Sequence, residues 1–165
     1  MRGLTIAVTG GAGFVGSHVC HLLGIGAHEK SLNFKCAEVR IIDLKPPRND
    51  NKLLAVFEDN AKPVCKLSFL QGSILDIEFL GKAFEGADVV IHVASLVDFG
   101  QNPKELILKV NVEGVKNVIE ACKINNVKAL VYTSSLETIS RKVPNVEMLD
   151  DAPYPKDVSD FLGGY

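Results

Sequence analysis

A glycine-rich segment near the N-terminus holds the residues best suited to binding chemistry. It reads "TGGAGFVG" over residues 9–16 and follows an apolar run directly. Gly10, Gly13 and Gly16 have the spacing of a turn that permits a tight bend, close approach of a pyrophosphate, and close packing of the next helix. The N-terminus of that helix would add free N–H groups and a partial positive charge. The segment predicts a dinucleotide site, and a purely structural turn is the alternative.

A second candidate for ligand chemistry is Asp43, which ends the next apolar run. A carboxylate at this place can accept hydrogen bonds from the ribose hydroxyls of an adenosine, which favours NAD over NADP. Asp43 lies further from the glycines than the usual ~20 residues. Lys45 and Arg48 follow closely and could receive a 2′-phosphate, so NADP stays open as the alternative cofactor. The alternative interpretation of Asp43 is a simple turn residue at the end of the strand.

Alternating strands and helices must position these residues. Nearly continuous apolar runs, typical of strands covered on both faces, predict strands at 4–10, 38–44, 66–72, 88–95 and 129–135. Helical patterns lie between them at 14–24, 76–86 and 103–126. Asp76 is the expected N-cap of the second helix and Gly86 its expected stop. The alternation predicts an α/β fold with a Rossmann-type doubly wound parallel sheet, whose ligand crevice lies at the carboxyl ends of the strands.

The bulk composition excludes several classes of protein. Hydrophobic residues make up 47% and charged residues 23%, as in a soluble globular domain. The net charge of -2 leaves no basic stripe for nucleic acid. The longest apolar run is interrupted by Asp88 and His92 and falls short of the ~20 residues of a membrane span. Four scattered cysteines without a Cys-x-x-Cys pair favour an intracellular, cytoplasmic protein with no metal site.

Taken together, these motifs resemble the extended short-chain dehydrogenase/reductases, and more narrowly the 3β-hydroxysteroid dehydrogenase/isomerase family. The likeness covers nearly the whole chain and is carried by "VTGGAGFVGSHV", "IIDL", "LQGSILD", "GADVVIHVAS", "NVEGVKNVIEAC" and "LVYTSSLE". The longer stretch "GADVVIHVASLVDFG" points to the steroid branch. The resemblance implies NAD-dependent oxidation of a hydroxyl on a steroid-like or sterol-like substrate.

The resemblance also implies roles for single residues in cofactor binding. The glycines would hold the pyrophosphate and Asp43 the adenosine ribose. Ala94 and Ser95 would lie beside the cofactor, and Asn111 would brace their turn from the long helix. Where the family usually has an acid near the adenine, this chain has Ser73, so weaker adenine recognition is expected. The expected cofactor-binding residues are Gly10, Gly13, Phe14, Val15, Gly16, Asp43, Ser73, Ile74, Ala94, Ser95 and Asn111.

The catalytic residues implied by the resemblance are Ser135 and Tyr165. Ser135, the last serine of "YTSS", would hydrogen-bond the substrate oxygen. Tyr165 would be the acid/base of a Tyr-x-x-x-Lys motif, in which cations lower the phenol pKa from its usual ~10. The lysine would stand four places beyond Tyr165, after the last residue given. The rival, Tyr154, has Val158 in place of that lysine.

The sequence therefore predicts one NAD(P)-binding Rossmann domain over residues 1–165, truncated before the last strands and the substrate lobe. Such a chain is expected to be inactive by itself, and its last strand to leave an apolar edge uncovered. A steroid-like substrate, and association with the endoplasmic reticulum, would belong to a full-length form; a homodimer is compatible with the resemblance. Two alternatives stay open: a catalytically silent NAD(P)-binding module, and part of a nucleotide-sugar epimerase or carbonyl reductase of the same superfamily.

Overall fold

The structure, a computed structural model, describes residues 2–25, 34–47, 63–97 and 101–139. Three residues that the sequence analysis singled out, Arg48, Tyr154 and Tyr165, lie outside these ranges. Among the described residues, no helix is both long enough and apolar enough to cross a bilayer.

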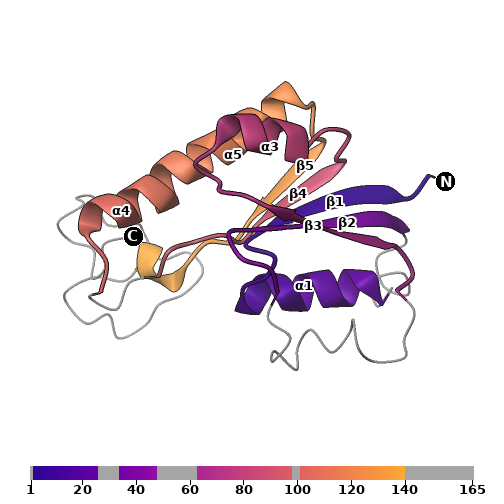
Figure 1. Cartoon of the computed structure of the whole chain (residues 1–165), viewed down its shortest axis with the longest axis horizontal. Helices are drawn as coiled ribbons and strands as arrows, with labels where there is room; N and C mark the ends of the chain where they lie inside the picture. Colours follow the sequence, from indigo (N-terminus) through magenta and orange to yellow (C-terminus); the bar gives the residue numbers. More distant parts are fainter. Residues whose placement is uncertain (1, 26–33, 48–62, 98–100, 140–165) are drawn as a thin grey trace.

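Five strands form one parallel sheet in the order β3-β2-β1-β4-β5 (Figure 1). The strands are β1 (Leu4–Thr9), β2 (Cys36–Asp43), β3 (Lys66–Gln71), β4 (Val89–His92) and β5 (Ala129–Tyr132). Every pairing between neighbours is parallel. This arrangement confirms the predicted Rossmann-type sheet. The chain reverses its direction of winding between β1 and β4, where such sheets bind their ligands.

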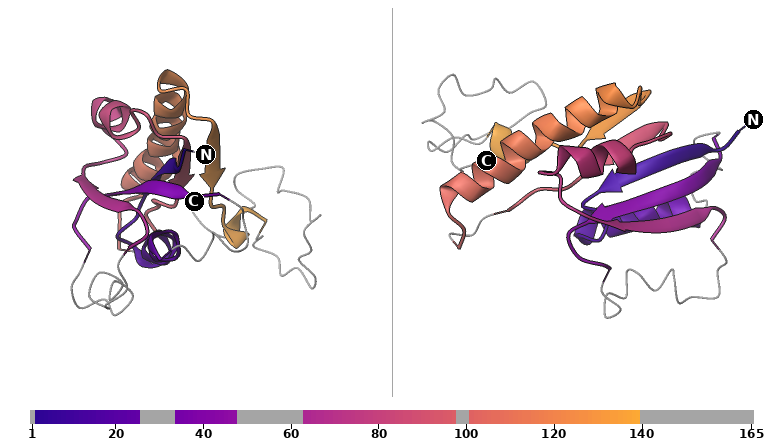
Figure 2. Two further views of the ribbon diagram at one scale, coloured as in Figure 1. Left: turned by 90° about the vertical axis from the view of Figure 1, so that its right-hand side faces the viewer. Right: turned by 45° about the horizontal axis from the view of Figure 1, so that its top comes forward.

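Helices cover both faces of the sheet, as Figures 1 and 2 show. The helical segments are α1 (Phe14–Gly24), α3 (Ile77–Ala83), α4 (Lys104–Leu108), η2 (Lys109–Glu113), α5 (Gly114–Ile124) and the short η3 (Leu136–Thr138). Helix α1 lies on one face, and α3 with the long α4-η2-α5 helix lies on the other. Segment η2 is a π-helical turn inside the long helix, where the sequence predicted an uninterrupted helix.

Two buried cores form because side chains alternate across the strands. In β1, Ile6 and Val8 face α1, whereas Ala7 faces α3 and α5. The α1-side core consists of Ile6, Val8, Cys20, Leu23, Cys36, Val39 and Ile41. The other core consists of Ala7, Ile42, Ile74, Leu80, Ala83, Phe84, Ala87, Val90, Val118, Ala121 and Cys122. With both faces covered, the continuous apolar strand pattern is explained.

The ends of α3 are fixed by local contacts that the sequence predicted in part. The Asp76 carboxylate accepts a hydrogen bond from the Phe79 amide at 3.0 Å, so the predicted N-cap is confirmed. Gly86, the predicted stop, has φ +67. The sequence did not predict the role of Arg40, whose Nη1 donates to the carbonyls of Ala83 at 2.9 Å and Glu85 at 2.6 Å. These bonds satisfy carbonyls that the helix end leaves unpaired.

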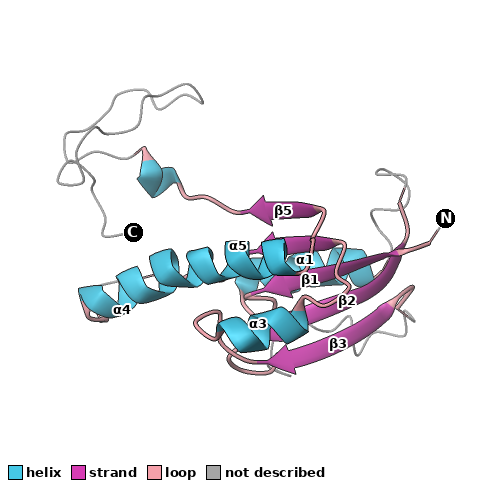
Figure 3. Ribbon diagram, turned by 90° about the horizontal axis from the view of Figure 1, so that it is seen from above, coloured by secondary structure: helices cyan, strands magenta, loops and turns pink. Residues whose placement is uncertain are grey.

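Strand β5 differs from the expectation that every strand is covered on both faces. It pairs with β4 along one edge and lies at the side of the sheet opposite β3 (Figure 3). Val131 is 50% exposed and Tyr132 is 55% exposed. The predicted uncovered apolar edge is therefore present among the described residues.

At the amino ends of the strands, Asp88 joins three elements. Its carboxylate accepts from Arg2 at 3.0 Å, from the Thr5 amide at 3.0 Å and from Lys128 at 2.7 Å. The hydrogen bond from Lys128, then those from Thr5 and Arg2, lower the pKa of Asp88 to about 2. Asp88 thus stabilises the edge of the sheet opposite the predicted crevice.

Candidate cofactor-binding site

The turn after β1 depends on Gly10. Its φ is +70, a left-handed conformation that side chains disfavour. A Cβ added at Gly10 would lie 2.7 Å from the backbone nitrogen of Ala94, so the turn after β1 touches the turn after β4. The Gly13 amide donates to the Gly10 carbonyl at 3.0 Å, which closes the loop.

Gly16 allows α1 to pack directly against this loop. A Cβ at Gly16 would stand 2.1 Å from the carbonyl oxygen of Gly10, closer than real atoms approach. Any side chain at this position would therefore push the start of α1 away from the turn. This close approach matches the geometry expected for the third glycine of a dinucleotide-binding turn.

The N-terminus of α1 opens onto the loop without a competing side chain. Gly13 is the N-cap, and no side chain of the described residues caps the helix or places an acid in its first turn. The amides of Phe14, Val15 and Gly16 have no acceptor within the helix, since the first turn of any helix leaves them unpaired. With the helix dipole, they suit an anion such as a pyrophosphate.

Asp43 lies at the carboxyl end of β2 and is held by two backbone amides. Its Oδ2 accepts from the Ala12 amide at 3.0 Å, and its Oδ1 accepts from the Leu44 amide at 2.8 Å. Each carboxylate oxygen can accept a second hydrogen bond. The carboxylate is therefore fixed beside the glycine loop with capacity left for ribose hydroxyls.

The turn after β3 carries Ser73 and Ile74. The Gly72 amide donates to the Asp43 carbonyl at 3.0 Å, which ties this turn to the end of β2. The hydroxyl of Ser73 accepts from the Leu75 amide at 3.1 Å and so shapes its own turn. Its own O–H can still donate, but it supplies no charge to a ligand.

The turn after β4 is held from behind by Asn111. Strand β4 ends at His92 and not at residue 95 as predicted, because the following residues leave the sheet to pass Gly10. The Asn111 Oδ1 accepts from the Leu96 amide at 2.8 Å and from Ser95 Oγ at 3.1 Å, while its Nδ2 donates to the Leu96 carbonyl at 3.0 Å. Asn111 is the central residue of the π-helical turn η2.

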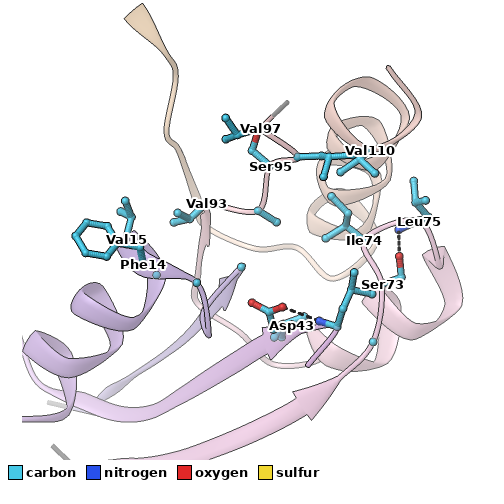
Figure 4. Close-up of a pocket in the computed structure, with 18 of the residues that line it drawn as sticks. Phe14, Val15, Asp43, Ser73, Ile74, Leu75, Val93, Ser95, Val97 and Val110 are labelled. Atoms are coloured by element: carbon cyan, nitrogen blue, oxygen red, sulfur yellow. Dashed lines mark hydrogen bonds between the residues drawn. The ribbon is translucent and has the colours of Figure 1, made fainter. Parts of the chain in front are cut away.

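These turns enclose one cleft of about 530 Å³, shown in Figure 4. Every expected cofactor-binding residue except Asn111 lines it, and Asn111 acts one layer behind through Ser95 and Leu96. The lining residues that the sequence analysis missed are Ile42, Leu44, Gly72, Leu75, Val93, Leu96, Val97, Leu106 and Val110. Most of these residues are adjacent in the sequence to an expected residue, so their position near the end of a predicted strand could have indicated that they line the cleft. Leu106 and Val110 belong to the long helix and follow no strand end, although Val110 directly precedes Asn111.

Ser135, the expected catalytic serine, is not among the described residues that line this cleft. Ser135 lies in the turn after β5, and its carbonyl accepts from the amide of Thr138 at 3.1 Å and from its hydroxyl at 2.7 Å. Tyr165 lies outside the described residues. Their catalytic roles therefore stay predictions.

A buried histidine lies in the sheet next to the cleft. The Nδ1 of His92 is 2.6 Å from Thr9 Oγ1, and its ring stacks on Tyr132 with centroids 5.2 Å apart. The Nε2 is buried and has no hydrogen-bond partner among the described residues. Burial lowers the pKa of His92 to about 4, so the ring is neutral near pH 7 and serves the core.

The parallel sheet, the glycine turn and the acid that ends β2 define a Rossmann-type dinucleotide-binding fold. The chain matches the 3-beta hydroxysteroid dehydrogenase/isomerase family over residues 7–160. It belongs to that family, as the sequence motifs predicted.

Known relatives agree with this assignment. The chain is 35% identical over 155 residues to the 3 beta-hydroxysteroid dehydrogenase type 7 of Rattus norvegicus, a match that covers 92% of this chain and 42% of the relative. The Homo sapiens protein of the same name is 34% identical over 155 residues, covering 92% and 38%. The chain thus spans less than half the length of these curated relatives.

Solved structures resemble the fold. A dTDP-glucose 4,6-dehydratase from Streptomyces venezuelae, with NAD and TYD bound, has a TM-score of 0.75 at 25% identity, covering 92% of this chain and 45% of that one. A uronate dehydrogenase mutant from Agrobacterium tumefaciens complexed with NAD has a TM-score of 0.68 at 24% identity, covering 93% and 49%. These likenesses confirm the fold predicted from the sequence.

Proposed function

We propose that residues 1–165 form a single domain that binds NAD in the cleft at the carboxyl ends of the strands. The observation that carries this proposal is the fixed Asp43 carboxylate beside the glycine loop and the uncapped N-terminus of α1. A pyrophosphate fits the loop, and an adenosine ribose fits the carboxylate. Relatives of the same fold are solved with NAD, which supports the choice of cofactor.

The preference for NAD over NADP rests on the charge of Asp43. A 2′-phosphate would meet the Asp43 carboxylate, which two hydrogen bonds from backbone amides hold in place. Like charges at contact distance oppose binding. Lys45 is exposed and is the only described cation directly after β2. The preference for NAD therefore requires that the repulsion of a 2′-phosphate by Asp43 exceeds its attraction to Lys45.

The proposed reaction is oxidation of a hydroxyl on a steroid-like or sterol-like substrate, carried out by a longer form of the protein. When bound, NAD supplies the acceptor for a hydride. Ser135 would hydrogen-bond the substrate oxygen, and Tyr165 would take its proton. An apolar substrate suits Val97, which lines the cleft, is 51% exposed and is not among the expected cofactor-binding residues.

The 165-residue chain by itself is proposed to bind NAD without turning over substrate. None of its three tyrosines has a lysine four places later within the sequence. A phenol without a cation nearby keeps a pKa near ~10 and is a poor base at neutral pH. The homodimer and the association with the endoplasmic reticulum that the resemblance allows stay predictions.

The test is calorimetric titration of the purified chain with NAD and with NADP, followed by an assay with NAD and a 3β-hydroxysteroid. We expect NAD to bind more tightly than NADP and no steroid to be oxidised at an ordinary rate. Absence of NAD binding would overturn the proposed cofactor site, and ordinary turnover would overturn the proposed inactivity. If a longer form bound a nucleotide sugar and left steroids unchanged, the steroid assignment would be wrong.

A further inference from the structure

The turn at Ser73–Leu75 forms one wall of the cofactor cleft, on the side expected to receive the adenine. Its backbone is joined to β2 through the Gly72 amide, and its own shape comes from the bonds around Ser73. These contacts leave open what fixes the turn against the helical layer. Helix α5 makes this contact, and the sequence did not predict that α5 touches this wall of the cleft.

Asn117 in α5 bonds directly to the backbone of this turn. Its Nδ2 donates to the carbonyl of Ile74 at 3.1 Å, across 43 positions of sequence. Asn117 is half-buried and does not line the cleft itself. It therefore acts on the cleft through Ile74.

Gly114, one turn earlier in α5, receives the side chain of the same residue. A Cβ at Gly114 would lie 2.5 Å from Cδ1 and 2.8 Å from Cγ1 of Ile74. Ile74 is buried, belongs to the core on this face and lines the cleft. Helix α5 thus fixes Ile74 at two points, the carbonyl through Asn117 and the side chain through the space at Gly114.

The opposite wall is held by the same continuous helix. Asn111 in η2 binds the backbone of Leu96, and Ser95 beside it faces the cleft (Figure 4). One helix therefore holds both the turn after β3 and the turn after β4. We infer that Asn117 and Gly114 are positioning residues that set the place of the adenine-side wall, an inference that rests on the proposed binding of NAD.

Asn117→Asp is the sharpest variant for testing this inference. It keeps the volume of the side chain, removes the N–H donor and places a carboxylate oxygen against the Ile74 carbonyl. We expect the affinity for NAD to fall about tenfold, the effect of one lost hydrogen bond with an unpaired carbonyl left behind. AMP, which holds only the adenosine half, should lose affinity by the same factor. Amide hydrogen exchange should become faster at Ser73–Leu75.

The matched control is Asn125→Asp. Asn125 Nδ2 donates to the carbonyls of Gly81 at 3.1 Å and Ala121 at 3.0 Å, so it too joins α5 to the α3 layer. Neither Asn125 nor Gly81 lines the cleft. A carboxylate at the C-terminal end of α5 also opposes the helix dipole, so the control should lower the melting temperature at least as much. Its affinities for NAD and AMP should stay within twofold of the unmodified chain.

Gly114→Ala tests the second contact, with Gly81→Ala as its control. A methyl group at Gly114 must shift the side chain of Ile74, whereas one at Gly81 meets no described atom within 4 Å. We expect weaker binding of both NAD and AMP only in Gly114→Ala. This pair also keeps the test decisive if Asn117→Asp does not fold.

Unchanged affinity and unchanged exchange at Ser73–Leu75 in both Asn117→Asp and Gly114→Ala would overturn the inference. A loss of affinity for NAD without a loss of affinity for AMP would also overturn the inference, because the defect would then lie outside the part of the cleft that binds the adenosine half. If the unmodified chain bound no NAD, the proposed function would be wrong. The exchange rates would still decide whether Asn117 and Gly114 hold the turn.

Discussion

Asp43 links two parts of the cleft through a single carboxylate. One oxygen is bonded to the glycine loop at Ala12, and the other to the backbone that follows β2 at Leu44. Because both bonds hold the carboxylate in place, its charge is available to a ligand without reorganisation. At the scale of single residues, we propose that this acid decides the choice between the two nicotinamide cofactors.

Asp43→Asn should weaken NAD binding about tenfold, since hydrogen bonds to a charged group contribute about 1.5–3 kcal/mol and the amide keeps only part of them. Binding of NADP should weaken less, because the repulsion of the 2′-phosphate is removed. Titration with both cofactors measures the ratio. Asp76→Asn is the control, because Asp76 caps α3 and does not line the cleft. An unchanged NAD to NADP ratio in Asp43→Asn would contradict this role.

His92 should make the stability of the fold depend on pH. Its pKa is about 4 in the folded protein because burial disfavours the charged ring, against ~6.5 in the unfolded chain. Above pH ~6.5 neither state binds the proton, so the full stability is present. As the pH falls towards 4, the unfolded chain takes up a proton first, and stability decreases.

His92→Gln should remove this part of the pH dependence. The difference in unfolding free energy between the two chains, measured in urea across this pH window, should shrink as the pH falls. Other titrating groups are common to both chains and cancel in the comparison. Parallel curves for the two chains would mean that His92 does not contribute.

At the scale of elements, the cleft depends on how closely α1 approaches the loop after β1. Gly16→Ala places a methyl group against the Gly10 carbonyl, where the gap is 2.1 Å. We expect a loss of about 1–3 kcal/mol in unfolding free energy, as for other overpacked sites, together with loss of NAD binding.

Gly81→Ala is the matched control for Gly16→Ala. Gly81 is also a helical glycine, but its Cβ would meet no atom of the described residues within 4 Å. The substitution should stabilise the chain by ~0.5–1 kcal/mol, because alanine favours the helix. If thermal unfolding showed the same change in stability for Gly16→Ala and Gly81→Ala, the close approach of α1 to the loop would not require a glycine at position 16.

The amino ends of the strands depend on Asp88. Its pKa of about 2 lies below the unfolded value of ~3.9, so its contribution is present above pH ~4 and lost as the pH falls through 2. Asp88→Asn should cost about 2 kcal/mol near pH ~7 and less in acid. Glu120→Gln, which removes one partner of an exposed pair with Lys123, should change stability by less than about 0.5 kcal/mol. A similar cost for both variants in urea unfolding would contradict the account of Asp88.

At the scale of the whole molecule, the sequence alone predicted those features of the fold and the cleft that depend on local patterns of residues. The bounds of α1 were predicted correctly, because its glycine entry and its apolar spacing lie within the segment itself. The parallel direction of the strands follows from the alternation of strands and helices with right-handed crossovers. The expected cofactor-binding residues other than Asn111 meet in one cleft because the carboxyl ends of parallel strands share one edge.

What the sequence could not predict depends on contacts between distant segments. The π-helical turn at Asn111 accompanies bonds to the backbone of Leu96, and no local pattern in the long helix indicates it. The link from Asn117 to Ile74 is of the same kind. The apolar pattern of β5 did not by itself indicate its exposure, because apolar composition indicates a strand but not how many neighbours it has; the uncovered edge was expected only from the resemblance to a longer family.

The most direct test of the central claim is an NMR titration of the isotope-labelled chain with NAD, which reads every backbone amide. The account predicts shifts that saturate together in the glycine turn, at Leu44, in the turn after β3 and at Ala94–Ser95, with Asp88 and the amino ends of the strands unaffected. Absence of saturable shifts, or shifts gathered away from the cleft, would contradict the assignment of this site to NAD.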